Sequence, residues 1–525
     1  MISLNAVEWG PIDADKKDPK FVEKWIEPDN IRSLLDDKVW LITGEKGSGK
    51  TAICRAIKEK HGERLFSISE VNFDKVGFNA IYMNLVEFAT TTSVSRLATL
   101  SNFWQFAILS QLVQDCARKS PRLYGDLALA TREKSSAEGM PEKLLSLLEN
   151  CWNFIDRVTG RDPRKGSDGT PANLVASQGL NASALTQLMS YPLDSDFLAL
   201  KKRFFQRLAE QRHATVLLLD GFDLLRNDDI PRDGVRLIFE SLIEAIRTIN
   251  SDPDLPEQIS IKALVPHDRY LGLTLGDSDK VSSFHLPIRW GRTPLKIFLH
   301  KRMQLCTALQ GDKFQQLWRD VMPETVLDPH THIEEDSFDF LLRHTMYRPR
   351  QLQLHLQRLA KSYPAQVIQP TMIPASVAES SKEIAKYFID EYRADHPNLG
   401  KFIAGLSRKD NIVEFKALRH IVADGLKKYA ARREDVVTDG AIEEKIDVLY
   451  AMGFFGIVKT PNGRDKTRDR YFPPARQGER RYVDFYYLNP QSHVGESLAD
   501  TDLVAFHPVI AEMAEMRPMF DILVG

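Results

Sequence analysis

The chain has 525 residues, and at about 150 residues per domain this length predicts about three domains. Hydrophobic residues make up 43% and charged residues 27%, so a wholly disordered chain, a collagen and a coiled-coil rod are excluded. Lys and Arg number 70 against 72 Asp and Glu, a formal net charge of -2, so any electrostatic footprint for nucleic acid must be local.

Cysteine usage and the N-terminus indicate the compartment. None of the cysteines forms a CxxC pair, which favours a reducing compartment over a disulfide framework or a zinc module; they are Cys54, Cys116, Cys151 and Cys306. The N-terminus lacks the basic region and apolar stretch of a signal peptide. No window approaches the roughly 18 apolar residues of a membrane span. We therefore expect a cytoplasmic protein that makes no membrane contact.

Strand and helix patterns alternate through the first part of the chain. Short apolar runs predict buried strands at 39–43, 79–86, 215–219, 259–265 and 284–288. Helical periodicity lies around them at 51–60, 95–118, 141–156, 195–212, 232–249 and 294–308. Residues 160–183 are rich in Gly, Ser, Asn and Pro, which predicts a surface loop or a disordered insert. The alternation predicts an α/β fold with a parallel sheet.

The second part of the chain has a different pattern. From about 335 to 393 we expect helices only, and after Pro397 a separate small unit with helices at 413–430 and 440–452 and a hairpin-like aromatic stretch at 482–488. The expected organisation is an N-terminal segment over 1–37, a core over 38–290, a helical part over 291–395 and a C-terminal domain over 396–525.

A phosphate-binding loop is the most specific motif in the sequence. GEKGSGKT at 44–51 matches GxxxxGK[ST] at every fixed position, with an apolar strand before it and a helix after it. The glycines let backbone N–H groups point at phosphate oxygens, and the helix adds the positive end of its dipole. We expect Lys50 to reach the β- and γ-phosphates and Thr51 to ligate Mg²⁺. The predicted nucleotide-binding residues are Gly44, Glu45, Lys46, Gly47, Ser48, Gly49, Lys50, Thr51 and Ala52.

An acidic residue at the end of a core strand completes such a site. The run VLLLD ends at Asp220, which we expect to hold Mg²⁺ directly or through water. Asp223 follows three residues later and is the candidate for orienting the attacking water.

These two motifs resemble those of P-loop ATPases of the broad AAA+/STAND group. LLLDGFD is similar to the Asp-Gly-x-Asp form of this strand in STAND-type switch ATPases. It departs from ordinary AAA+ enzymes, where a Glu follows the Asp and this chain has Gly221, and from the NACHT subgroup, whose further Glu is replaced by Leu224. The resemblance implies ATP and Mg²⁺ as cofactors and ATP hydrolysis that is slow or depends on a trigger.

Later segments extend the resemblance over about residues 30–393. ISIKALVPHDRY resembles the strand that ends at the sensor 1 position, near His267, Asp268 and Arg269, and Arg269 is a candidate arginine finger. FHLPIRWGRTPLKIFLHKRM resembles the strand and helix that lead into the helical lid of these ATPases. TMYRPR resembles the step that opens the sensor 2 helix, which implies that Arg350 reaches the γ-phosphate. The overall order is similar to a poorly characterised set of bacterial P-loop ATPases, some found near phage-defence genes.

Some of these arginines have a simpler interpretation. A surface charge or a local salt bridge is the alternative for Arg302, Arg348 and Arg350. A GTPase is disfavoured because no strand end in the α/β region carries the Asn/Thr-Lys-x-Asp signature.

A basic stretch marks the C-terminal domain. Residues 459–481 contain eight basic and three acidic residues, a balance of +5, between two predicted strands. Helices followed by such a pair of strands resemble a winged helix with the basic loop as its wing tip. In initiator-type AAA+ proteins this domain contacts DNA, mainly at phosphates. A solvated loop on a protein-interaction winged helix is the alternative. The candidate contacts with DNA or a partner are Arg464, Lys466, Arg468 and Arg470.

The sequence therefore predicts a parallel-sheet P-loop NTPase core with a helical lid and a C-terminal winged-helix-like domain. We expect an ATP-hydrolysing switch that controls a partner protein or a homo-oligomer, with a role in bacterial anti-phage defence implied by the resemblance. One alternative is an initiator-like ATPase that grips double-stranded DNA with its basic wing. Another is a non-hydrolysing, ATP-bound scaffold, which Gly221 favours.

Overall fold

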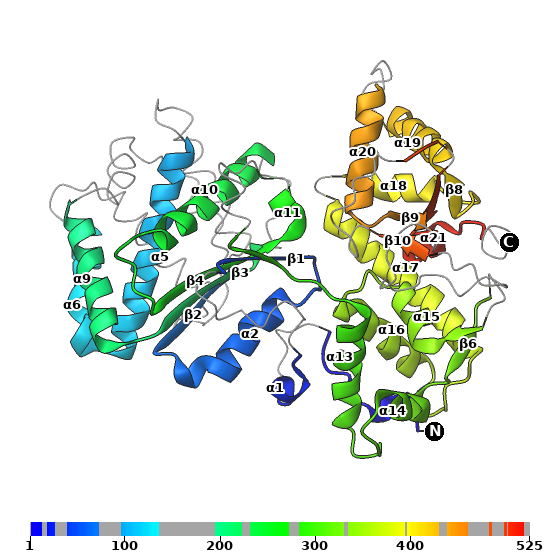
Figure 1. Cartoon of the computed structure of the whole chain (residues 1–525), viewed down its shortest axis with the longest axis horizontal. Helices are drawn as coiled ribbons and strands as arrows, with labels where there is room; N and C mark the ends of the chain where they lie inside the picture. Colours follow the sequence, from blue (N-terminus) through cyan, green and yellow to red (C-terminus); the bar gives the residue numbers. More distant parts are fainter. Residues whose placement is uncertain are drawn as a thin grey trace, which may run out of the picture. The chain divides into compact units, whose positions relative to one another are not determined.

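The computed structural model divides the chain into two compact units (Figure 1). One unit spans Asn30–Ile288, and the other combines Met1–Asp29 with Arg289–Gly525. The first unit is therefore an insertion in the sequence of the second. The structure describes residues 2–12, 18–26, 39–72, 96–135, 195–222, 232–271, 273, 283–329, 334–393, 396–429, 438–459, 482–485, 498–500 and 502–518.

The inserted unit is built on a five-stranded parallel sheet in the order β2-β3-β4-β1-β5. The strands are β1 (Leu41–Gly44), β2 (Ser67–Asn72), β3 (Thr215–Asp220), β4 (Ile259–Pro266) and β5 (His285–Pro287). Strands β1, β3 and β4 are buried along their whole length, as expected for a parallel sheet covered on both faces. The predicted α/β fold with a parallel-sheet P-loop core is confirmed.

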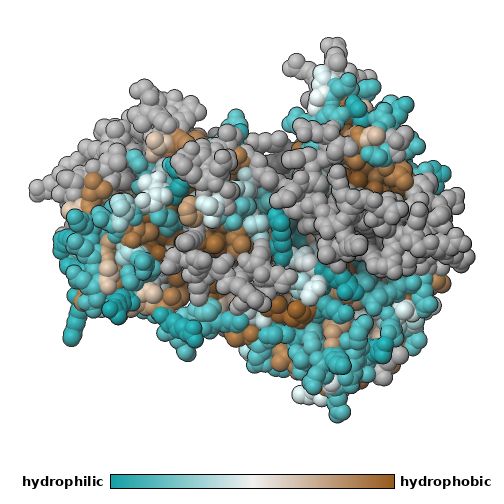
Figure 2. Space-filling model, viewed as in Figure 1, coloured by the Kyte–Doolittle hydropathy of each residue, from teal (hydrophilic) through white to brown (hydrophobic). Residues whose placement is uncertain are grey.

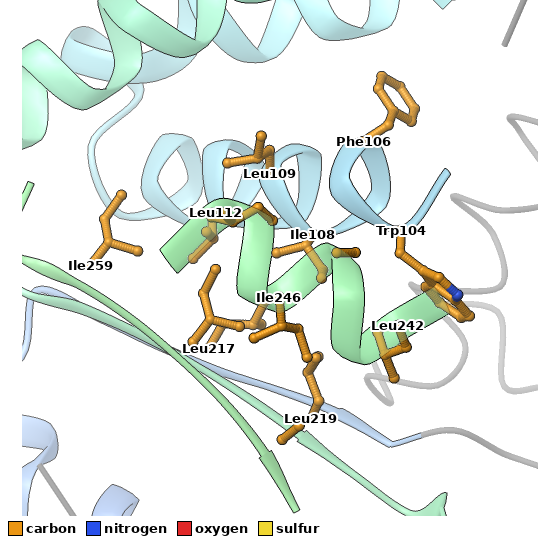
Figure 3. Packing of buried hydrophobic residues seen from close by; sticks show 14 of the residues in the cluster. Trp104, Phe106, Ile108, Leu109, Leu112, Leu217, Leu219, Leu242, Ile246 and Ile259 are labelled. Carbon is orange, nitrogen blue, oxygen red and sulfur yellow. The ribbon is translucent and has the colours of Figure 1, made fainter. Parts of the chain in front are cut away.

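Helices α5 and α10 pack against each other over the sheet (Figure 3). Ile108 and Leu112 lie four residues apart on one side of α5. Together with Ile246 of α10 they are buried with Leu217 of β3 in one hydrophobic cluster. Burial of each such side chain contributes about 1.5–3 kcal/mol. The helices that the structure describes in this unit are α2 (Lys50–His61), α5 (Arg96–Lys119), α6 (Pro121–Ser135), α9 (Ser195–Gln211), α10 (Arg232–Asn250), α11 (His267–Leu271) and the 3-10 turn η2 (Gly62–Arg64).

Four predicted strands of this unit are confirmed within a few residues, as β1, β3, β4 and β5. Strand β2 was not predicted, because SISEVN has neither a continuous apolar run nor strict alternation of polar and apolar residues. Its place at the sheet edge, paired only with β3 among the described strands, explains that composition. The predicted strand at 79–86, helix at 141–156 and loop at 160–183 lie outside the described residues.

The second unit begins with a helical part. Its elements are η1 (Leu4–Ala6), α1 (Phe21–Lys24), α13 (Arg292–Gln304), α14 (Phe314–Val321), the antiparallel strands β6 (Thr325–Leu327) and β7 (Glu334–Asp336), α15 (Ser337–Arg343), α16 (Pro349–Ser362) and α17 (Met372–Tyr392). The N-terminal residues pack on α16: Asn5 Nδ2 donates to Pro364 O at 2.7 Å, and Gln353 Nε2 donates to Trp9 O at 2.6 Å. No sequence pattern predicted this contact.

The C-terminal part forms a four-stranded antiparallel sheet in the order β10-β9-β11-β8. It shares a hydrophobic core with the helical part, because Met346, Phe388 and Tyr392 pack in the same cluster as Phe454 and Phe506. Its elements are α18 (Leu399–Ala404), β8 (Ile412–Glu414), α19 (Phe415–Tyr429), α20 (Asp439–Ala451), β9 (Phe455–Lys459), β10 (Tyr482–Asp484), β11 (Leu503–Phe506) and α21 (Pro508–Ala514).

The described surface is largely hydrophilic on the face shown in Figure 2. Exposed large apolar side chains occur on different elements, such as Leu198 on α9, Ile297 on α13 and Tyr387 on α17. Among the described helices, none combines the length and the apolar character that crossing a membrane requires.

Candidate functional site

The loop between β1 and α2 has a backbone that requires glycine. Gly47 has φ 83° and Gly49 has φ 104°, conformations that side chains with a Cβ rarely adopt. Ser48 N donates to Glu45 O at 3.0 Å and closes the turn, and Ile53 N donates to Gly49 O at 2.9 Å at the start of the helix. The glycines at these two positions therefore follow from the local backbone.

Gly44 is required for a different reason. A Cβ at this position would lie 2.4 Å from Ser48 Oγ and 2.9 Å from Ile288 Cδ1. Both distances are shorter than a real Cβ contact allows, so even alanine would force the side chains of Ser48 and Ile288 to shift. The loop is thus closed tightly over the end of β1.

Lys50 is buried with its ammonium group inside the loop. Its side chain is 4% exposed, and Nζ donates to Gly44 O at 2.9 Å and to Glu45 O at 3.3 Å. A cation at the N-terminus of a helix, beside a loop rich in backbone N–H groups, is a site for an anion. The glycine backbone and the lysine together fit the phosphates of a nucleotide. Thr51 follows on α2 and is half-buried.

Asp220 lies at the same edge of the sheet. It is the last residue of β3 and is 2% exposed. Strand β4 lies between β3 and β1, with Leu219 opposite Ala263 and Gly44 opposite Pro266. Because the strands are parallel, their carboxyl ends meet at one edge, which brings the Asp220 end of β3 to the edge that carries the loop. Asp223 lies outside the described residues, and its role stays a prediction.

The strand ends beside the loop are joined by polar contacts. Thr43 Oγ1 lies 2.7 Å from His285 Nε2 and 3.4 Å from His267 Nδ1, which links β1 to β5 and to the start of α11. Arg269 is the third residue of the short helix α11 and is half-buried. The predicted sensor 1 segment, residues 259–270, thus reaches this edge of the sheet at its end, whereas an arginine-finger role for Arg269 stays a prediction.

Two residues that the sequence did not assign to the site, Cys54 and Glu70, lie next to Asp220. The ligand atoms of Cys54 on α2, Glu70 on β2 and Asp220 lie within 4.8 Å of one another. Lys58, one turn after Cys54, forms an ion pair with Glu70. Burial and the charges of Asp220 and Glu70 raise the pKa of the Cys54 thiol well above its usual value. The only sequence signal is the i, i+4 spacing of Lys50, Cys54 and Lys58 along one side of α2.

The candidate arginines of the second unit have different environments. Arg348 is buried, and Nη1 donates to Glu391 Oε2 at 2.7 Å, so the local salt bridge is its observed role. Arg302 donates to the backbone oxygens of Trp9 and Lys24, again a structural role. Arg350 is the second residue of α16 and is half-buried. A contact between Arg350 and the γ-phosphate stays a prediction.

The basic stretch joins two paired strands. Lys459, the last residue of β9, lies opposite Tyr482, the first residue of β10. The predicted contact residues are in the connection between these strand ends and lie outside the described residues; they are Arg464, Lys466, Arg468 and Arg470.

These features define the fold and the phosphate loop of the P-loop NTPase class. The sheet order, the GxxxxGKT loop between β1 and α2 and the aspartate that ends β3 are its defining parts. Residues 31–232 match the family model described as "AAA ATPase domain", so this stretch of the chain carries such a domain. No curated protein matches the chain.

Two solved structures are similar to the chain at low identity. The first, "Structure of the Aeropyrum Pernix ORC2 protein (ADPNP-ADP complexes)", has 13% identity and a TM-score of 0.32 over 85% of this chain and 92% of that one. The second, "Crystal structure of CDC6P from Pyrobaculum aerophilum", has 13% identity and a TM-score of 0.29 over 97% of each chain. TM-scores this low establish no shared arrangement of the whole chain.

Proposed function

We propose that this protein binds ATP with Mg²⁺ and hydrolyses ATP. The observation that carries the proposal is the buried Lys50 ammonium inside a glycine loop at the start of α2. The backbone of Gly44–Thr51 and Lys50 would bind the phosphates, and Thr51 and Asp220 would hold Mg²⁺. When bound, Mg²⁺ supplies neutralisation of the charge that develops on the phosphoryl oxygens. Asp223 is the proposed residue that orients the attacking water.

We further propose that the ATPase works as a switch of the STAND type. ATP between the core and the helical lid would favour one arrangement of the two, with Arg350 contacting the γ-phosphate, and hydrolysis would favour the other. The Asp-Gly-x-Asp form of the β3 end and the Pro349-Arg350 step support this mode. The switch would act on a partner protein or a homo-oligomer. A role in bacterial anti-phage defence rests on the sequence resemblance alone.

The test is ATP binding and turnover by Lys50→Ala. We expect at least about a tenfold loss of affinity, since hydrogen bonds from a charged group contribute about 1.5–3 kcal/mol. Lys60→Ala is the matched control, because Lys60 is exposed on the same helix. A thermal melt of both variants is needed, since Lys50 also binds two loop carbonyl groups. Normal ATP turnover by a folded Lys50→Ala protein would overturn the assignment of the site.

The second candidate function is an initiator-like ATPase that binds double-stranded DNA. It is favoured by the basic residues between β9 and β10, which are antiparallel neighbours as the strands of a wing are. Each phosphate contact should steepen the dependence of log affinity on log salt by about 0.9. Replacing Arg464, Lys466, Arg468 and Arg470 by Gln should remove salt-sensitive DNA binding, whereas Lys60→Gln should not. Stimulation of ATP turnover by DNA would favour this function over a protein-sensing switch.

A third candidate is a scaffold that holds ATP without hydrolysis. Gly221 has φ 86°, so the glutamate that ordinary AAA+ enzymes carry after the aspartate would be strained at this position. If the protein is such a scaffold, we expect it to retain nucleotide through purification and to turn over ATP negligibly, and we expect Asp223→Asn to leave both properties unchanged. Measurable turnover that Asp223→Asn reduces would exclude it.

A further inference from the structure

We propose that Cys54, Glu70 and Asp220 form a second cation site, one that takes thiophilic divalent ions such as Zn²⁺ and Cd²⁺. The site depends on the fold and not on hydrolysis, although it shares Asp220 with the proposed Mg²⁺ site. A thiophilic ion would therefore compete with Mg²⁺ for this carboxylate.

The three residues converge from three different elements. Cys54 lies in the second turn of α2, Glu70 near the end of β2 and Asp220 at the end of β3. Sγ and one oxygen of each carboxylate lie within 4.8 Å of one another. Zn–S and Zn–O bonds of about 2.3 and 2.0–2.2 Å place neighbouring ligands of a tetrahedral ion roughly 3.3–3.7 Å apart. Small side-chain rotations would bring the three ligand atoms from their present separation to the one that a bound ion requires.

Burial and charge both favour a cation in this cluster. Cys54 is 0% and Asp220 2% exposed, and Cys54 is not part of a disulfide. The buried carboxylate of Asp220 and the half-buried carboxylate of Glu70 repel each other, and an ion between them would turn the repulsion into attraction. Lys58 balances the charge of Glu70 by an ion pair, and because its side chain is 38% exposed it can turn toward water when an ion binds.

The thiol decides which ions are preferred. Mg²⁺ selects oxygen ligands, whereas Zn²⁺ and Cd²⁺ favour thiolate. On binding, the metal replaces the proton on Sγ, and that proton passes to solvent. A bound ion would tie the second turn of α2 to β2 and β3, directly behind the phosphate loop. Zn²⁺ or Cd²⁺ should thus hold the loop in place and exclude Mg²⁺ from Asp220.

The experiment is a Cd²⁺ titration of the full chain without nucleotide, followed by the ultraviolet charge-transfer band of cadmium thiolate. We expect a band that saturates at one Cd²⁺ per chain and is lost in Cys54→Ala. Cys116→Ala and Cys306→Ala are matched controls, because both residues are buried free thiols; Cys151 is kept in every variant. Glu70→Gln and Asp220→Asn should each weaken Cd²⁺ binding at least about tenfold, the loss of one charged ligand.

Three outcomes would overturn the proposed site. The wild-type protein shows no cadmium-thiolate band, the band persists in Cys54→Ala, or Cys116→Ala loses the band as fully as Cys54→Ala does. If Cys54→Ala unfolds, Cys54→Ser keeps the size of the side chain, and a folded serine variant with the wild-type band is equally decisive. Binding of ATP with Mg²⁺ is measured on the same samples. Normal ATP binding without the band overturns only the thiophilic site, and the band without ATP binding overturns only the proposed function.

Discussion

His507 donates a hydrogen bond from Nε2 to the backbone oxygen of Thr345 at 3.2 Å. Its other nitrogen, Nδ1, accepts from Val509 N at 3.1 Å, so the ring is the neutral tautomer with its proton on Nε2. The bond joins the end of β11 to the turn that precedes α16, and Met346 of the same turn packs in the C-terminal core. The start of α16, where Arg350 lies, is therefore held in place by the C-terminal sheet.

The buried histidines predict a loss of stability in mild acid. Burial lowers the pKa of His507 to about 3 and that of His355 to about 4. The unfolded chain takes up a proton at each position below about pH 6.5, whereas the folded chain does not until its lower pKa is reached. Stability is therefore full above pH 6.5 and falls as the pH drops below it, by about 1.4 kcal/mol per residue per pH unit.

Urea denaturation between pH 7.5 and 5 measures this effect. In His507→Asn the slope of stability against pH should be smaller by about 1.4 kcal/mol per unit, because one depressed pKa is removed. His420→Asn, an exposed position on α19, should keep the wild-type slope. An unchanged slope in His507→Asn would contradict the assignment of this ring as a neutral buried group.

We expect Arg348 to contribute to the stability of the protein and Arg350 to contribute to ATP turnover. Arg348→Ala leaves the buried Glu391 without its ion-pair partner, and breaking a buried pair costs about 3–5 kcal/mol. Arg350→Ala should leave the melting temperature and ATP binding close to wild type and reduce turnover, as a γ-phosphate contact requires. Melting curves and ATP turnover of the two variants separate the roles. Equal destabilisation by both substitutions would place Arg350 in the same structural class as Arg348.

Arg302 should hold the N-terminal residues on the helical part. Its guanidinium donates to Trp9 O at 3.0 Å, Lys24 O at 3.2 Å and Phe298 O at 3.0 Å, and loss of hydration lowers its pKa to about 9. Arg302→Leu removes these bonds and should destabilise the unit by about 2–4 kcal/mol.

Limited proteolysis with mass spectrometry measures release of residues 2–26 in this variant. Arg319→Ala is the control, since Arg319 forms an exposed pair with Glu324 and should change stability by less than about 0.5 kcal/mol. Equal resistance of Arg302→Leu and the wild-type protein to the protease would rule out the anchoring role.

Substitution of the loop glycines by alanine should weaken ATP binding, whereas the same substitution at the end of α2 should not. Gly49→Ala forces a Cβ into φ 104° at a cost of about 1–2 kcal/mol, and Gly44→Ala meets Ser48 Oγ at 2.4 Å, so both should weaken ATP binding. Gly62 ends α2 with a helical φ of -56° and has no atom within 4 Å of a Cβ. Gly62→Ala should therefore keep wild-type affinity and be neutral or slightly stabilising. Isothermal titration with ATP compares the three variants, and a loss of affinity in Gly62→Ala alone would contradict the expectation.

The phosphate loop was predictable because its geometry is local. Gly44 to Thr51 are consecutive, and the positive φ values of Gly47 and Gly49 are properties of single residues. Strands β1 and β3 were predictable for a related reason, since strands buried on both faces favour continuous apolar runs. The parallel order of the sheet then places Asp220 at the edge that carries the loop.

Only the tertiary structure decided which side chains far apart in the sequence become partners. Arg348 and Arg350 are two residues apart with the same side chain, and only the packing of α17 against α16 buries the first one with Glu391. Gln353 reaches Trp9 across 344 residues of sequence, and Glu70 meets Asp220 because β2, an unpredicted edge strand, pairs with β3. By itself the sequence determined the nucleotide loop and the buried central strands, because backbone geometry and burial on both faces constrain neighbouring residues directly. Side-chain partners depend on which surfaces pack together, and packing is set by the whole fold.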